Sequence, residues 1–254
     1  MNNQTFDFRR FSLLLQKELW SGNKKPLIVV GAAFGFLMLF AWLMISTNGG
    51  YENLNFNFFP LVLIGGGLVF TSVIYYEFND KTGTHHYLSL PASNFEKYLS
   101  KWVITAILFP IAAILLFWIY VKLADGLYHY YTEKHITSWF LNEWWSWFFL
   151  KIYIVLQSIY LIGAIAFQKY TFFKTSLTSF FLYVLFVVTC LAAHRIIFAE
   201  FYDGFEPTGY MDTNHSTQEF VLVTMMKWAE YAAWFLVPPI MWAVGFFKLK
   251  EKEA

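Results

Sequence analysis

Charged residues and cysteines are both scarce in this chain. Only 14% of its 254 residues are charged, and it contains one cysteine. A soluble domain usually carries about 25% charged residues, so the chain lacks the polar surface that a water-soluble globule or a disordered protein needs. A disulfide requires two cysteines, so Cys190 excludes an intrachain bridge and a disulfide-stapled secreted domain. The N-terminus also lacks the short apolar stretch, ending in small residues, that marks a cleavable signal peptide.

Apolar residues make up 58% of the sequence and gather in six stretches that carry no charge. These uncharged stretches are 26–51, 53–76, 102–121, 152–168, 175–194 and 231–247. A helix needs roughly 20 apolar residues to cross a bilayer. The sequence therefore predicts an all-α polytopic membrane protein that forms one domain over 1–254. We expect its six spans at about 26–46, 58–77, 102–121, 149–168, 176–194 and 229–247.

The cations are distributed unevenly between the predicted loops. Lys and Arg favour the cytoplasmic ends of membrane helices. Alternate loops, together with the two tails, hold 13 of the 18 Lys and Arg residues. This asymmetry predicts that both the N- and the C-terminus are cytoplasmic. With a formal net charge of +1, the chain has no strongly basic face, and we expect no nucleic acid partner.

The segment 6–24, which precedes the first span, has an amphipathic pattern. Its apolar residues recur at spacings of three and four, and its polar residues lie between them. The apolar set is Phe8, Phe11, Leu15 and Leu19, and the polar set is Arg9, Arg10, Gln16 and Lys17. This pattern predicts a helix that lies on the inner leaflet with its cations near anionic lipid. The alternative is a basic tail without regular structure.

The second loop carries the most specific local signal. Ser93 followed three residues later by Glu96 is a capping box, which satisfies two unpaired backbone donors at a helix start. Pro91 prevents a helix from reaching this point from the preceding residues. We therefore expect a short amphipathic helix that begins at Ser93 and runs into the third span. The sequence pattern alone fits a docking element for a cytoplasmic partner and a helix resting on the lipid surface equally well.

The stretch YLSLPASNFEKYLSKW, between the second and third of six spans, resembles the permease subunits of type-two-class ABC exporters. These permeases commonly carry a turn of Leu, Pro, a small residue and Ser, followed by a helix that ends in Lys. The matching positions here are Leu90, Pro91, Ala92, Ser93, Glu96, Lys97 and Lys101. The resemblance covers the whole chain in architecture, but in residues it covers only this loop.

The resemblance implies a half-transporter without enzymatic activity of its own. In that family the loop helix docks on a cytosolic ATPase subunit, and we expect Asn94 to join the matching positions in this contact. Two permeases, identical or different, pair around a substrate path in the bacterial cytoplasmic (inner) membrane. The chain contains no G-x-x-x-x-G-K-[ST] phosphate loop, so the partner subunit would bind the ATP. The alternative function is a non-transporting membrane scaffold or sensor whose cytoplasmic loop binds a partner.

Several further features concern packing inside the membrane. Gly31 and Gly35 form a G-x-x-x-G pattern that lets another helix approach closely, and we favour a helix of the same chain. Pro238 and Pro239 are expected to kink the sixth span. Gln157 is expected to make hydrogen bonds between helices. A second capping box, Ser216 and Glu219, predicts a short helix at 216–228, which either dips into the membrane or lies on its surface. We expect no metal site and no catalytic residues.

Overall fold

The computed structural model describes residues 6–20, 25–47, 58–79, 81–132, 144–197, 202–203, 206–207, 227–228, 231 and 234–253. Nearly all of them are helical, in agreement with the expected fold class. The helices in the first half of the chain, up to residue 132, are α1 (Phe8–Trp20), α2 (Lys25–Ser46), η2 (Leu61–Gly66), α4 (Gly67–Val73), η3 (Tyr76–Asn79), α5 (Lys81–Leu88), α6 (Asn94–Val103), η4 (Ile104–Leu108) and α7 (Phe109–Thr132). They are followed by α8 (Trp144–Ala166), α9 (Thr171–Ile197), the two-residue antiparallel strands β1 (Tyr202–Asp203) and β2 (Glu206–Pro207), and α11 (Val237–Glu253).

Within the described residues, three helices are long and apolar enough to cross a membrane. They cover 94–131, 144–166 and 171–192, and two shorter apolar helices cover 34–46 and 58–73. The chain thus has the character of a membrane protein. Of the six predicted spans, the third, fourth and fifth coincide with the three long helices, and α2 coincides with the first.

The predicted ends of the second and the sixth span both differ from the structure. The helix that begins at Phe58 ends at Val73 rather than at residue 77, and a 3₁₀ turn follows over Tyr76–Asn79. The continuous part of the last helix, α11, runs from Val237 to Glu253, so it ends later than the predicted residue 247. Pro238 and Pro239 lie in its first turn, and the described residues 234–235, before a turn at Leu236, are also helical. The expected kink at Pro238 and Pro239 therefore stays a prediction. The predicted helix at 216–228 lies outside the described residues, apart from 227–228.

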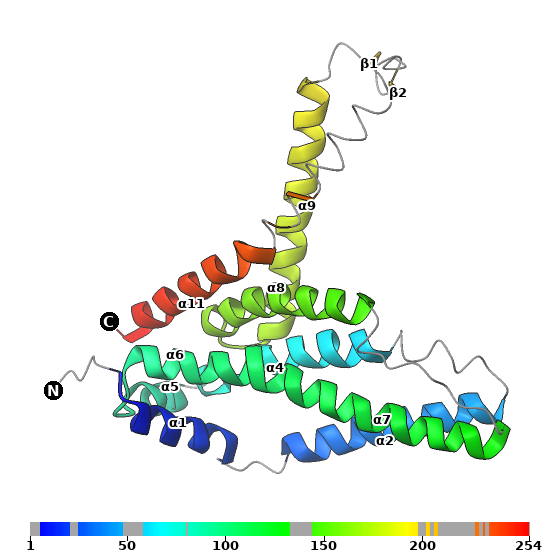
Figure 1. Cartoon of the computed structure of the whole chain (residues 1–254). Coiled ribbons are helices and arrows are strands. Elements are labelled where there is room, and N and C mark those ends of the chain that lie inside the picture. The colour runs from blue at the N-terminus through cyan, green and yellow to red at the C-terminus, as the bar shows by residue number, and fades with distance from the viewer. Residues whose placement is uncertain are drawn as a thin grey trace.

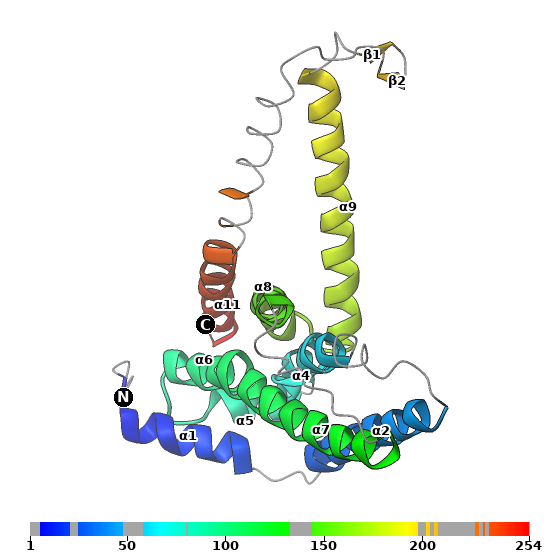
Figure 2. The same ribbon diagram turned by 45° about the vertical axis from the view of Figure 1, so that its right-hand side comes forward.

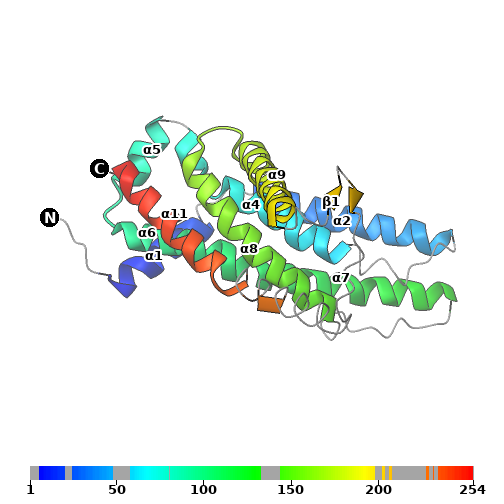
Figure 3. The ribbon, with the colours of Figure 1, turned by 90° about the horizontal axis from the view of Figure 1, so that it is seen from above.

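The helices α2, α4, α7, α8 and α11 form a layered bundle in which most axes run in similar directions (Figure 3). Within it α2 packs on α7, α4 on α8, and α8 on α11. The helix α9 leaves this bundle near its first turns and extends away from it (Figures 1 and 2). Only 6% of the apolar 18-residue stretch of α9 is buried, whereas 44% of the corresponding stretch of α8 is buried. In a single chain α9 is therefore almost uncovered.

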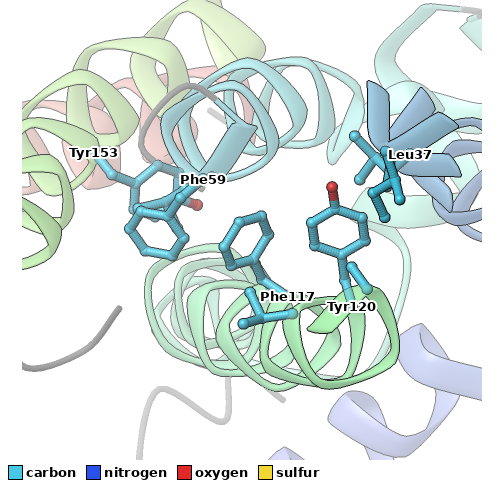
Figure 4. Close-up of a cluster of buried hydrophobic side chains, with 11 residues drawn as sticks. Leu37, Phe59, Phe117, Tyr120 and Tyr153 are labelled. Carbon is cyan, nitrogen blue, oxygen red and sulfur yellow. The ribbon is translucent and has the colours of Figure 1, made fainter. Parts of the chain in front are cut away.

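Two clusters of buried side chains hold the bundle together. In the first cluster, Phe117 and Tyr120 of α7 lie between Leu37, which belongs to α2, and Phe59, which lies just before η2 (Figure 4). The second cluster joins the turn after α4 to α5, α6, α8 and α11. Its buried members are Tyr75, Phe78, Tyr87, Tyr98, Leu161, Ala164, Ile165 and Leu249. This second cluster lies at the end of the bundle where α1 and the C-terminal end of α11 are found (Figure 1).

Among the described residues, none lies close to the glycine pattern of α2. A Cβ added at Gly31 or at Gly35 would meet no atom within 4 Å in the described structure. The helix α2 instead packs on α7 through residues further along, among them Leu37 and Ala41. Close backbone approach occurs at another glycine, since a Cβ at Gly163 would overlap the Thr175 side chain. The expectation of an intrachain helix against Gly31 and Gly35 therefore stays a prediction.

Candidate functional site: buried ion pairs between α1 and α6

The predicted capping box forms at the start of α6. The backbone N–H of Glu96 donates to Ser93 Oγ at 3.2 Å, and the backbone N–H of Ser93 donates to Glu96 Oε2 at 2.8 Å. The helix then continues through η4 into α7 without interruption. Both expectations for this loop, a helix start at Ser93 and a helix running into the third long helix, are confirmed.

Glu96 also binds the N-terminal helix, which the sequence did not indicate. Its Oε1 accepts the backbone N–H of Asp7 at 2.7 Å and lies 3.2 Å from Arg10 Nη2. The Glu96 side chain is fully buried. A carboxylate can be buried at low cost when charged and backbone donors satisfy its oxygens. One side chain thus caps α6 with one oxygen and holds the start of α1 with the other.

Lys101, near the end of α6, makes a second set of ion pairs. Its Nζ lies 2.5 Å from Glu18 Oε2, on α1, and 3.1 Å from Glu77 Oε1, on η3. The rings of Tyr87 and Tyr75 flank the ammonium group, with centroids 5.3 and 5.8 Å from Nζ. Lys101 is only 1% exposed. Two carboxylates and one ammonium group therefore share a site from which water is largely excluded.

These contacts define which face of α1 points inward. Arg10, Leu14 and Glu18 recur every four residues, so they lie on one face of the helix, and this face packs on α6. Phe8 and Leu19, 74% and 54% exposed, lie on a different face. Arg9 and Lys17 are exposed, and Phe11 is partly buried. Of the expected lipid-facing cations, Arg10 is therefore placed differently, because Glu96 draws it into the protein.

The expected docking residues separate into a buried and an accessible group. Glu96, Lys97 and Lys101 are all at most 2% exposed. Leu90, Ser93 and Asn94 are partly buried, whereas Pro91 is exposed. The neighbouring Phe95 is 48% exposed and contacts the rings of Phe6 and Phe246, each with a centroid distance of 6.0 Å. Within 89–101 the exposed side chains are thus those of Ser89, Pro91 and Phe95, whereas the charged side chains Glu96, Lys97 and Lys101 are buried.

One further cation lies at the edge of the site. Lys252 of α11 lies over the Phe78 ring, with Nζ 4.6 Å from the centroid. Partial burial, together with repulsion from Lys248, lowers the pKa of Lys252 below its ordinary value. This contact ties the end of α11 to the residue that follows Glu77.

Sequence reasoning missed Glu18, Glu77 and the two tyrosines around Lys101. The spacing of Arg10 and Glu18 was a usable signal, because residues eight apart share a helix face and opposite charges on it are rare in so apolar a chain. Neither a family model, nor a curated protein, nor a solved structure matches this chain. The function must therefore be inferred from the sequence pattern and this geometry.

Proposed function

We propose that the chain is the permease subunit of an ATP-driven ABC exporter, in which a separate ATPase subunit docks on the loop before α6. The observation that supports this most is the form of that loop. A capped helix presents an exposed tip of Ser89, Pro91 and Phe95, and the same helix continues into a membrane-length helix. A force applied at the tip would therefore act directly on a helix inside the bilayer.

The two ion-pair sites give the tip a second mechanical connection. Glu96 and Lys101 bind α1 at opposite ends of the contact between α1 and α6, so the two helices would move together. Removing one partner of a buried pair costs about 3–5 kcal/mol. That is enough to keep the two helices associated during a conformational change. In the proposed transporter, α1 lies on the inner leaflet and its exposed Phe8 and Leu19 enter the lipid surface.

The proposed topology has six spans with both termini in the cytoplasm of a bacterial cell. The asymmetric distribution of Lys and Arg supports it. The placement of α1, α6 and the end of α11 at one end of the bundle is consistent with it (Figure 1). A second permease, identical or different, would complete the translocation path, and ATP would bind only to the ATPase subunits.

The proposal is tested by co-purification from native membranes in mild detergent. We expect the tagged chain to retain a second chain that carries a phosphate-loop motif and hydrolyses ATP. Phe95→Asp should abolish the association, because it places a charge on the exposed tip at a residue that takes no part in the ion pairs. Lys169→Asp, at another exposed position, is the matched control and should not affect it. Glu96 is unsuitable for this test, because its replacement would also disturb α1.

Two outcomes would overturn the permease function. The first is purification without any ATP-hydrolysing chain. The second is a stable partner that lacks the phosphate loop, together with vesicles that show no ATP-dependent flux of any candidate substrate. This second outcome would favour the scaffold or sensor function instead.

A further inference from the structure

The first of the three membrane-length helices, which covers 94–131, contains a π-helical turn next to a proline. The turn covers Ile104–Leu108, and its end is closed by the N–H of Phe109, which donates to Ile104 O. In a π-helix each carbonyl accepts from the residue five positions later. The carbonyl of Thr105 would therefore need the N–H of residue 110. That residue is Pro110, which has no N–H.

A side chain from another helix supplies the missing donor. The hydroxyl of Tyr153, on α8, donates to Thr105 O at 2.6 Å. Both Tyr153 and Thr105 are fully buried, so water does not satisfy this carbonyl. Tyr153 reaches it because Gly67 leaves room, since a Cβ at Gly67 would overlap the Tyr153 ring. The Tyr153 hydroxyl thus supports the π-helical turn.

The Thr105 side chain extends this support to α11. Thr105 Oγ1 accepts Gln157 Nε2 at 2.9 Å, and Gln157 Oε1 accepts Trp242 Nε1 at 3.1 Å. Thr105 Oγ1 also donates to Lys101 O at 2.9 Å. The expected interhelical hydrogen bonds of Gln157 are confirmed, and they converge on the same turn.

A regular α-helix is the alternative register for this segment. In it the N–H of Phe109 would donate to Thr105 O, four positions earlier, instead of to Ile104 O. The Thr105 carbonyl would then have a backbone donor and would not need Tyr153. We propose that Ile104–Leu108 is a register switch between α6 and α7, and that the hydrogen bond from Tyr153 holds it in the π form.

The switch would move the ion-pair site described above. One residue of register corresponds to a rotation of about 100° and a shift of about 1.5 Å along the axis. Lys101 lies one turn before Thr105, so this rotation would carry its ammonium group away from Glu18 and Glu77. The register of the π-helical turn and the ion pairs between α1 and α6 are therefore coupled, and a change of register would break these ion pairs. This inference does not depend on the proposed transport function.

Spin-label distances in the full chain, reconstituted in lipid nanodiscs, test the switch. Labels at Phe95 and Leu115, both exposed, report the rotation of α6 against α7 in a Cys190→Ser background. We expect one distance in the parent protein and a second distance, shifted by roughly 5 Å, in Tyr153→Phe. Tyr160→Phe is the matched control, because that hydroxyl on the same helix bonds Ser176 and not the turn.

A second variant separates the switch from a general effect of losing a hydroxyl. Pro110→Ala restores an N–H that can donate to Thr105 O in the π form. In this background Tyr153→Phe should no longer produce the second distance. The switch is refuted if Tyr153→Phe leaves the distances unchanged, if Tyr160→Phe changes them equally, or if the effect of Tyr153→Phe persists undiminished in Pro110→Ala.

Discussion

Replacing Lys101 by Met tests the ion pairs between α1 and α6 most severely. The substitution preserves most of the apolar volume of the side chain but removes its charge. It leaves Glu18 and Glu77 facing each other, 7% and 16% exposed, without the ammonium group that both contact. Two carboxylates in a site with little water repel each other and lose the hydration that the unfolded chain would give them.

The expected cost follows from the number and burial of these contacts. Removing one partner of a buried ion pair destabilises a protein by about 3–5 kcal/mol. For a chain of this size, each kcal/mol lowers the midpoint of thermal unfolding by roughly 2–4 °C. We therefore expect Lys101→Met to unfold roughly 6–20 °C below the parent protein. Tryptophan fluorescence during heating of the detergent-solubilised protein measures this shift.

Two comparison variants make the result specific to the ion pairs. Lys169→Met removes an exposed Lys and should shift the midpoint by no more than about 2 °C. Adding Glu18→Gln and Glu77→Gln to Lys101→Met removes the stranded charges and should recover most of the lost stability. The reasoning is refuted if Lys101→Met and Lys169→Met unfold at the same temperature, or if the triple variant is no more stable than Lys101→Met.

Two further predictions concern other contacts. Arg10→Glu and Glu96→Arg should each destabilise the protein by about 3–5 kcal/mol, while the double exchange should recover part of the loss. Additive losses in a double-mutant cycle would argue against the pair. Gly163→Ala should cost about 1–3 kcal/mol because its Cβ overlaps Thr175, whereas Gly31→Ala should be neutral or slightly stabilising because its Cβ meets open space. Thermal unfolding of the two glycine variants checks this difference, and equal shifts would contradict it.

Local signals in the sequence predicted local structure well. The start of α6 follows from Ser93 and Glu96 because a capping box involves residues only three apart. The helix α1 follows from the periodic apolar residues of 6–24. Length and the absence of charge likewise identified the three long apolar helices. Each of these properties depends on neighbours along the chain.

Contacts between distant segments could not be predicted in the same way. The pair of Lys101 and Glu18 joins residues 83 positions apart, so it depends on how α1 packs against α6. The G-x-x-x-G pattern of α2 indicates a surface that permits close approach, but it does not say which helix approaches. The contact that buries Glu96 against the start of α1 likewise cannot be read from the residues next to Glu96 in the sequence.

The central claim is that the exposed tip before α6 contacts an ATPase subunit, and site-specific photo-cross-linking tests it most directly. A photo-reactive residue at Phe95 should cross-link, in native membranes, to a chain that carries a phosphate-loop motif. The same residue at Leu115, exposed on α7, should not. The account is contradicted if Phe95 yields no such adduct, or if the two positions yield the ATPase adduct in equal amounts.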